Sequence, residues 1–114
     1  KITVFDDVYF SPLSLRRLVE LLELVIIKRL NGTFNLGSKD GMSKARFAFK
    51  LAGVLELSTK YMSGGGVETI KLTANRAKDM RMDSSKFENS FNVELPTLTQ
   101  EVESLKGSYP NESR

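Results

Sequence analysis

The stretch GTFNLGSKDGMSKARFAFKLAG, from Gly32 to Gly53, contains the local signals that decide the fold. Residues 33–36 are rich in strand-forming side chains and predict a short buried strand. Residues 37–42 contain two glycines and predict a turn. Ser43 then stands in the N-cap position of a helix that we expect to continue to about Gly53. This order of strand, turn and helix favours an α/β fold.

The residues before this stretch predict a strand followed by a long helix. Residues 2–5 are typical of a short strand, and residues 6–11 of a turn. Ser11 and Pro12 occupy the N-cap and first-turn positions of a helix expected to continue to about Leu30, before Asn31 and Gly32 end it. Its apolar residues recur at three- and four-residue spacing, so one face is expected to pack on a core. They are Leu15, Leu18, Leu22, Val25 and Ile26.

The residues after Gly53 predict a loop, a brief strand and two shorter helices. The three glycines at 64–66 make this region the best candidate for a flexible loop, and residues 69–72 predict a short strand. Helices are expected over residues 83–89 and 97–106, the second beginning with a capping box of Thr97 and Gln100. We expect residues 1–106 to form one domain with about four helices, and residues 107–114 to be a disordered tail.

The composition excludes several classes of protein. The 17 basic residues are interspersed with 14 acidic ones, so the net charge of +3 indicates a solvated surface and not a nucleic-acid partner. The sequence has no cysteine and no histidine, which excludes a disulfide framework and makes a zinc site unexpected. Charged residues interrupt the apolar segment 13–30, so no membrane span is expected. We expect a cytoplasmic location.

The common catalytic and nucleotide-binding motifs are absent from the sequence. Three residues separate Gly37 from Gly41, where a P-loop requires four, and no Gly-x-Gly-x-x-Gly follows a predicted strand. Tyr9, Tyr61 and Tyr109 have no lysine four residues later, so the tyrosine-lysine pair of short-chain dehydrogenases is missing. We therefore expect no catalytic, cofactor-binding or metal-binding residue within these 114 residues.

Polar residues at the ends of predicted elements are the remaining candidates for a site. They are Asp6 and Asp7 after the first strand, and Arg76, Asp79, Arg81 and Asp83 after the later one. Adjacent carboxylates are typical of turns. A guanidinium group offers paired donors to phosphate oxygens, and a surface salt bridge is the alternative role for each of these arginines.

Three groups of residues, in order along the chain, carry a resemblance to a known family. Near the start, Asp7 and Pro12 match the family pattern, whereas Phe10 and Leu13 depart from it. In the middle, the matches are Leu36, Gly37, Ser43, Phe47 and Ala48. In NRAKDMRMDSSKF, residues 75–87, the matches are Arg76, Met82, Asp83 and Lys86, while Ala77 replaces a proline. Together they resemble the C-terminal substrate-domain portion of the dTDP-4-dehydrorhamnose reductase family, a branch of the extended short-chain dehydrogenases.

The resemblance implies a part of a larger enzyme. It implies an upstream Rossmann domain, absent from this sequence, that binds NAD or NADP, with a nucleotide-linked sugar held in the cleft between that domain and this chain. On this interpretation the chain is a substrate-binding fragment of a sugar-nucleotide reductase or epimerase and is not catalytic alone. Arg76 and Asp7 are then the substrate-binding residues, while Asp83 and Lys86 anchor the following helix. The resemblance leaves open a homodimer.

Two other functions stay open at this point. Some relatives of the family keep the fold for binding only, such as the beta subunit of methionine adenosyltransferase, so a regulatory or binding subunit is the alternative. A Tyr-x-x-x-Lys pair in an upstream sequence would favour the enzyme, and its absence would favour the binding subunit. An autonomous small binding domain is the third hypothesis. The strand-like start KITVF lacks a methionine, so we expect Lys1 to be a truncation point.

Overall fold

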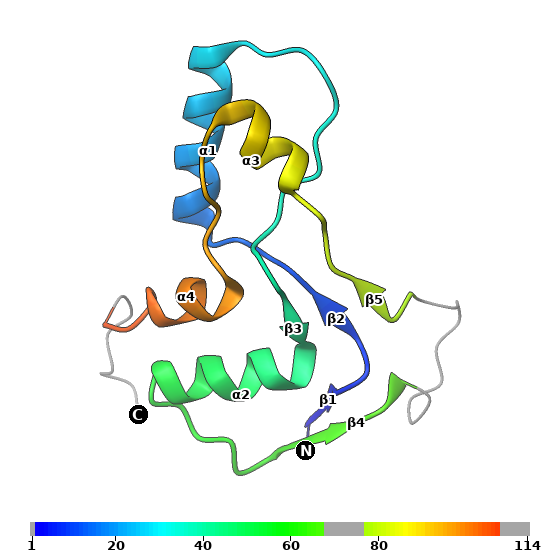
Figure 1. The fold of residues 1–114 in the computed structure, drawn as a ribbon. Coiled ribbons are helices and arrows are strands. Elements are labelled where there is room, and N and C mark those ends of the chain that lie inside the picture. Colours follow the sequence, from blue (N-terminus) through cyan, green and yellow to red (C-terminus); the bar gives the residue numbers. More distant parts are fainter. Residues whose placement is uncertain (1, 68–76, 108–114) are drawn as a thin grey trace.

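The chain folds as a mixed α/β structure with four helices and short strands among the residues that the structure describes (Figure 1). The structure is a computed structural model, and it describes residues 2–67 and 77–107. In chain order the elements are β1 (Ile2–Phe5), β2 (Tyr9–Phe10), α1 (Leu15–Lys28), β3 (Met42–Ser43), α2 (Lys44–Val54), β4 (Met62–Gly65), β5 (Asp79–Met80), α3 (Ser85–Phe91) and α4 (Leu98–Glu103). The α/β class and the helix number predicted from the sequence are confirmed.

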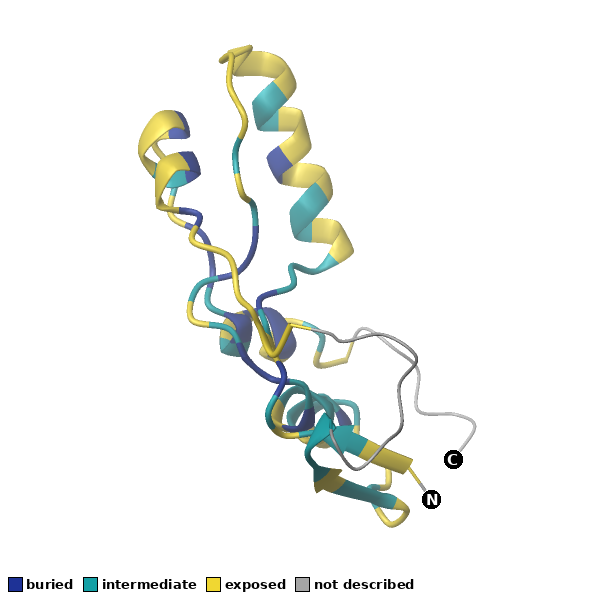
Figure 2. Ribbon diagram, turned by 90° about the vertical axis from the view of Figure 1, so that its right-hand side faces the viewer, coloured by how far each residue is buried: buried dark blue, intermediate teal, exposed yellow. Residues whose placement is uncertain are grey.

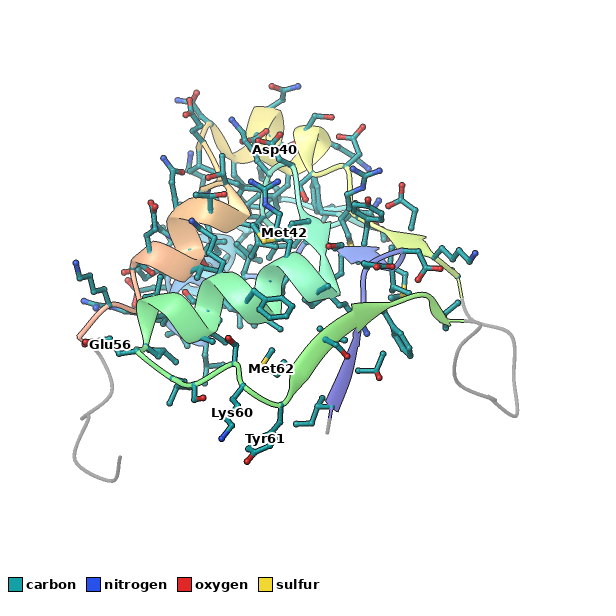
Figure 3. The ribbon with its side chains drawn as sticks, turned by 90° about the horizontal axis from the view of Figure 1, so that it is seen from below. Asp40, Met42, Glu56, Lys60, Tyr61 and Met62 are labelled. Carbon is teal, nitrogen blue, oxygen red and sulfur yellow. The ribbon has the colours of Figure 1, made fainter. Side chains whose placement is uncertain are left out.

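The strands form two small sheets. In the first, β1 pairs with β4 in parallel, from Ile2 beside Met62 to Phe5 beside Gly65. In the second, β2 lies between β3, which is antiparallel to it, and β5, which is parallel. Sheets this small depend on helices for their stability. Helix α2 lies against both β1 and β4; Figure 3 shows Met62 on the side of β4 toward α2 and Tyr61 pointing away.

Two apolar clusters hold the structure together. The aromatic cluster joins α1 to α3 and contains the buried residues Leu21, Phe87, Phe91 and Leu95. The rings of Phe87 and Phe91 stack with centroids 4.5 Å apart, and Phe34 contacts the Phe91 ring edge to face at 5.3 Å. The α2–α4 cluster contains Met42, Leu98 and Val102. Each helix pair therefore buries its own apolar surface.

The described structure is flat. Its principal extents are 46, 39 and 20 Å, and its radius of gyration is 16.3 Å. A compact domain of this length has a radius of gyration of about 13 Å. Figure 2 shows most of the α1 ribbon in the colour of exposed residues, and Leu21 is the residue of this helix that is buried.

The predicted caps of two helices are confirmed. Ser43 begins α2, and its hydroxyl oxygen accepts a hydrogen bond from the Arg46 amide at 3.1 Å. Thr97 begins α4 in a complete capping box: the Gln100 amide donates to the Thr97 hydroxyl at 3.1 Å, and the Thr97 amide donates to the Gln100 side chain at 2.9 Å. Helix α2 ends at Val54, one residue beyond the predicted Gly53.

The start of α1 differs from the prediction. Ser14, and not Ser11, caps the helix by accepting a hydrogen bond from the Arg17 amide at 3.1 Å. Ser11 is buried, and its hydroxyl accepts from the Met82 amide at 2.9 Å. The Ser11 hydroxyl is therefore used in a hydrogen bond to a distant part of the chain and does not cap the helix. The helix ends at Lys28, and Arg29, with φ of 53°, takes the left-handed role expected of Asn31 and Gly32.

The predicted core face of α1 is wrong for three of its five residues, whereas Val25 packs against the aromatic cluster as predicted. Leu21 is its buried residue, whereas Leu15, Leu22 and Ile26 are 78%, 48% and 70% exposed. Leu18 and Val25 are half-buried. The helix has apolar residues on two faces, and the face that meets Phe87 and Phe91 becomes the core. Spacing along the helix does not distinguish the two faces.

Several predicted strands and turns are also wrong. Residues 33–36 form no strand in the described structure; Phe34 instead packs on the aromatic cluster. Gly64 and Gly65 belong to β4 and not to a loop, and an added side chain at Gly64 would meet the Asp6 carboxylate at 3.4 Å. Strands β2 and β3 include residues that were predicted to form turns. Helix α3 begins at Ser85, two residues after the predicted start. The predicted strand 69–72 and the tail 108–114 lie outside the described residues.

Candidate functional site

The candidate site lies where β1 and β4 end. Because the two strands are parallel, their carboxyl ends meet at the same edge, and Asp6, Asp7, Gly66 and Val67 follow directly. The Asp6 amide donates to the Gly65 carbonyl at 3.0 Å, which continues the pairing by one residue. In open α/β sheets, ligands bind outside the carboxyl ends of parallel strands.

Asp7 joins three segments at this edge. Its Oδ1 accepts a hydrogen bond from the Val67 amide at 3.0 Å, and its Oδ2 lies 3.5 Å from the Lys78 ammonium group. The Asp7 side chain is 29% exposed and that of Lys78 is 50% exposed. A Cβ atom at Gly66 would approach the Asp7 Oδ2 to 3.2 Å, so glycine suits this close approach. Asp7 thus positions the chain on both sides of residues 68–76.

A recess of about 330 Å³ adjoins these residues. Its lining is mainly apolar and consists of Phe5, Val8, Lys44, Val67, Ala77 and Met80. This volume is at the lower end of the roughly 300–1,000 Å³ of small-molecule sites, which combine apolar walls with a few polar groups. Val67 and Ala77, the described residues on either side of residues 68–76, both line the recess.

Lys44 supplies the positive charge of the recess. It is the first residue of α2, and its amide donates to the Val8 carbonyl at 2.8 Å. Its ammonium group lies 5.6 Å from the centre of the Phe10 ring. No carboxylate among the described residues forms an ion pair with Lys44. A cation beside apolar walls can receive an anionic group of a ligand.

Arg81 belongs to a salt bridge beside the recess and not to its lining. Its guanidinium donates to both Asp79 oxygens, at 2.8 and 2.6 Å, and lies 4.9 Å from the Tyr9 ring centre. These bonds from Arg81 lower the pKa of Asp79 from 3.8 to about 2. Arg81 therefore has the salt-bridge role that the sequence left open for each arginine.

Asp83 and Lys86 anchor α3, as predicted. The Asp83 carboxylate accepts from the Ser85 amide at 3.0 Å and the Ser85 hydroxyl at 2.7 Å, and these bonds lower its pKa. The Lys86 ammonium donates to the Thr33 carbonyl at 3.0 Å and lies 5.0 Å from the Phe34 ring centre.

The N-terminus of α1 already holds an internal anion. The buried carboxylate of Glu101, from α4, accepts the Ser14 amide and lies 3.6 Å from the Arg17 guanidinium. This carboxylate takes the position that a ligand anion would need. A larger hollow beside α2 and α4, of about 810 Å³, has a mainly charged lining in which Lys50 and Glu103 form an ion pair at 3.7 Å. The recess at Asp7 therefore suits a small-molecule ligand better.

Of the two substrate-binding residues predicted from the sequence, the structure describes only one. Asp7 lies at the site, while Arg76 lies outside the described residues, directly before Ala77. Sequence reasoning missed Lys44 and Lys78. Their signals were present: Lys44 follows the helix cap Ser43, and Lys78 stands two residues after Arg76.

Within residues 2–67 and 77–107, no group of three or more acidic side chains could hold a metal ion. None of the helices in these ranges is long and apolar enough to cross a membrane.

Comparison with known proteins gives matches in structure only. No family model matches the sequence, and no curated protein sequence matches it. Solved structures do share its fold, including a dTDP-4-dehydrorhamnose reductase from Bacillus anthracis str. Ames in complex with NADP. That protein has a TM-score of 0.84 at 18% identity, over 95% of this chain and 38% of that one.

Two further structures agree. The dTDP-4-dehydrorhamnose reductase of Yersinia enterocolitica has a TM-score of 0.79 at 18% identity, over 96% of this chain and 38% of that one. A reductase of the same name from Clostridium acetobutylicum ATCC 824 has a TM-score of 0.79 at 19% identity, over 90% of this chain and 36% of that one. At these identities the likeness establishes the fold alone. The chain spans about 38% of the length of these structures and has the fold of a portion of dTDP-4-dehydrorhamnose reductases, consistent with the C-terminal portion that its motifs resemble.

Proposed function

We propose that this chain is the substrate-binding portion of an NADP-dependent sugar-nucleotide reductase, and that a nucleotide-linked sugar binds at the recess beside Asp7. The observation that carries the proposal is the TM-score of 0.84 to a dTDP-4-dehydrorhamnose reductase over 95% of the chain. The recess supports it, because it lies at the carboxyl ends of parallel strands and combines apolar walls with Lys44.

Each residue of the site has a proposed role. The apolar walls receive the faces of the sugar or base, and Lys44 attracts the diphosphate. Arg76, directly before the recess residue Ala77, donates paired hydrogen bonds to the diphosphate oxygens. Asp7 is a substrate-binding residue in this proposal, and it also holds Val67 and Lys78 in position.

The cofactor belongs to another part of the proposed enzyme. The residues of this chain do not fit a dinucleotide, because no Gly-x-Gly-x-x-Gly is present in the sequence. NADP, which is bound in the Bacillus anthracis structure, would be held by a Rossmann domain outside these residues, and its reduced form, NADPH, would supply the hydride. The chain alone would then bind and orient the sugar nucleotide without catalysis. We place the parent enzyme in the cytoplasm, in agreement with the absence of cysteine.

Titration with dTDP-glucose, followed by amide chemical shifts, tests the site. We expect shifts at Val67, Ala77 and Met80, which line the recess. Arg76→Ala should weaken binding by about 1.5 to 3 kcal/mol, the scale of charge-assisted hydrogen bonds. Arg81→Ala is the matched control, because the Arg81 guanidinium is paired with Asp79. Shifts confined to other surfaces, or equal affinity of the Arg76→Ala variant, would contradict the proposed site.

A further inference from the structure

Helix α1 carries a narrow row of exposed apolar side chains, which we name the α1 seam: Leu15, Val19, Leu22 and Ile26. These four side chains are 78%, 58%, 48% and 70% exposed. The seam points away from Leu21, the α1 residue that is buried in the aromatic cluster. No neighbour within the described structure covers it (Figure 2).

The spacing of the seam identifies the kind of surface that fits it. Its residues follow one another at intervals of four, three and four. This is the a/d spacing of a coiled coil, a narrower stripe than the face by which a helix usually covers a core. The complementary partner is therefore another helix with the same spacing.

The charges beside the seam indicate which helix that is. Arg16 and Glu23, seven residues apart, both border the seam on the same side and are exposed. Neither forms an ion pair within the described ranges. If a second α1 lies antiparallel about a two-fold axis, Arg16 approaches the partner's Glu23, and the reverse pair forms by symmetry. In a parallel arrangement, Glu23 would instead face the partner's Leu18, and Arg16 would face a position before the start of the partner's α1, so neither charge would have a complement.

We propose that two copies of this chain associate through an antiparallel pair of α1 helices. Leu15 then packs on the partner's Ile26, and Val19 packs on the partner's Leu22. Arg16 pairs with the partner's Glu23, and Glu23 pairs with the partner's Arg16, so two ion pairs form along one side of the seam. A helix of 14 residues is about 21 Å long, so the contact is small and the dimer reversible. The inference does not rest on the proposed function, because α1 lies apart from β1 and β4, where the recess is (Figure 1).

Sedimentation equilibrium over a range of chain concentrations tests the pairing. The unaltered chain should show a monomer–dimer equilibrium, and Leu22→Glu should abolish it without changing the circular dichroism spectrum. Leu57→Glu is the matched control, because Leu57 is 47% exposed but lies outside the seam, and this variant should still dimerise. A chain that is monomeric at every concentration, or a Leu57→Glu variant that loses the dimer, would overturn the proposal.

Charge exchange tests the orientation. Arg16→Glu alone and Glu23→Arg alone should each weaken dimerisation by roughly tenfold, since each variant places like charges together on both copies. The double variant should restore the original affinity. Failure of the double variant to recover would overturn the antiparallel arrangement.

Disulfide trapping tests the register, because the chain contains no cysteine of its own. Under oxidation, a mixture of Val19→Cys and Leu22→Cys chains should form the mixed disulfide more readily than either variant links to itself. Preferential linking of Val19→Cys to itself would indicate a parallel pair and would contradict the proposal.

Discussion

Two adjacent residues, Leu21 and Leu22, show how sharply burial changes along α1. Leu21 is 8% exposed and contacts the aromatic cluster, whereas Leu22 is 48% exposed. Leu21→Asp should abolish cooperative unfolding, or lower the free energy of unfolding by more than about 3 kcal/mol, because it buries an unpaired charge. Leu22→Asp, at the same low chain concentration, should change it by less than about 1 kcal/mol. Urea denaturation followed by circular dichroism measures both, and equal losses would show that the helix faces are misassigned.

The pair of Asp79 and Arg81 predicts a local pH dependence. Hydrogen bonds from Arg81 lower the pKa of the Asp79 carboxyl group from 3.8 to about 2 in the folded chain. The folded state therefore binds this proton less tightly than the unfolded state, so the pair's contribution is complete above pH 3.8 and is lost as the pH falls toward 2. A carboxyl-carbon NMR titration should show the low midpoint, and Arg81→Gln should raise it. An unchanged midpoint in that variant would exclude Arg81 as the cause.

At the scale of elements, the short helix α4 depends on its cap. It has six residues, too few for stability without capping and tertiary packing. Thr97→Ala removes the hydroxyl that accepts the Gln100 amide and should lower the free energy of unfolding by about 1 kcal/mol. Thr99→Ala is the control within the same helix, since no hydrogen bond of the Thr99 side chain contributes to the cap. Urea midpoints of both variants check the prediction, which fails if the control loses as much.

The elements that could be predicted from the sequence are those whose signals are local. The caps at Ser43 and Thr97 involve residues three apart, so the sequence shows both partners together. Strands β2, β3 and β5 have two residues each and arise from pairing across long sequence separations. The segment 33–36 has the composition of a strand but no strand partner within the described residues. Pairing partners, unlike propensities, are not visible in a short window.

The candidate site was predictable only in part, for the same reason. Asp7 could be proposed because it follows a predicted strand, yet its contacts with Val67 and Lys78 span 60 and 71 positions of the chain. Lys44 enters the recess because α2 packs beside β1, and no local pattern indicates that packing. The role of Arg76 in substrate binding comes from the family resemblance alone and stays a prediction, which the titration of the Arg76→Ala variant tests.

At the scale of the whole molecule, the proposed function assigns the cofactor to another domain and the sugar nucleotide to this chain. The isolated chain should therefore bind one ligand and not the other. The isolated 114-residue chain should show no saturable micromolar binding of NADPH in a fluorescence titration, because it lacks the glycine fingerprint. The same sample should bind dTDP-glucose at the recess. Tight NADPH binding, or reduction of a dTDP-4-keto sugar by this chain alone, would refute the assignment of the cofactor site to another domain.

The hydrogen bond between Glu101 and Ser14 means that α1 is synthesised well before the carboxylate that caps it. The carboxylate that caps α1 comes from a residue 87 positions later in the chain. At about 5 to 20 residues per second, translation reaches Glu101 roughly 4 to 17 seconds after Ser14. Before α3 is synthesised, α1 has its local Ser14 hydroxyl cap but lacks its aromatic partners, and it lacks the buried anion until Glu101 follows. The nascent helix therefore exposes its future core face until Phe87 and Phe91 of α3 have been synthesised.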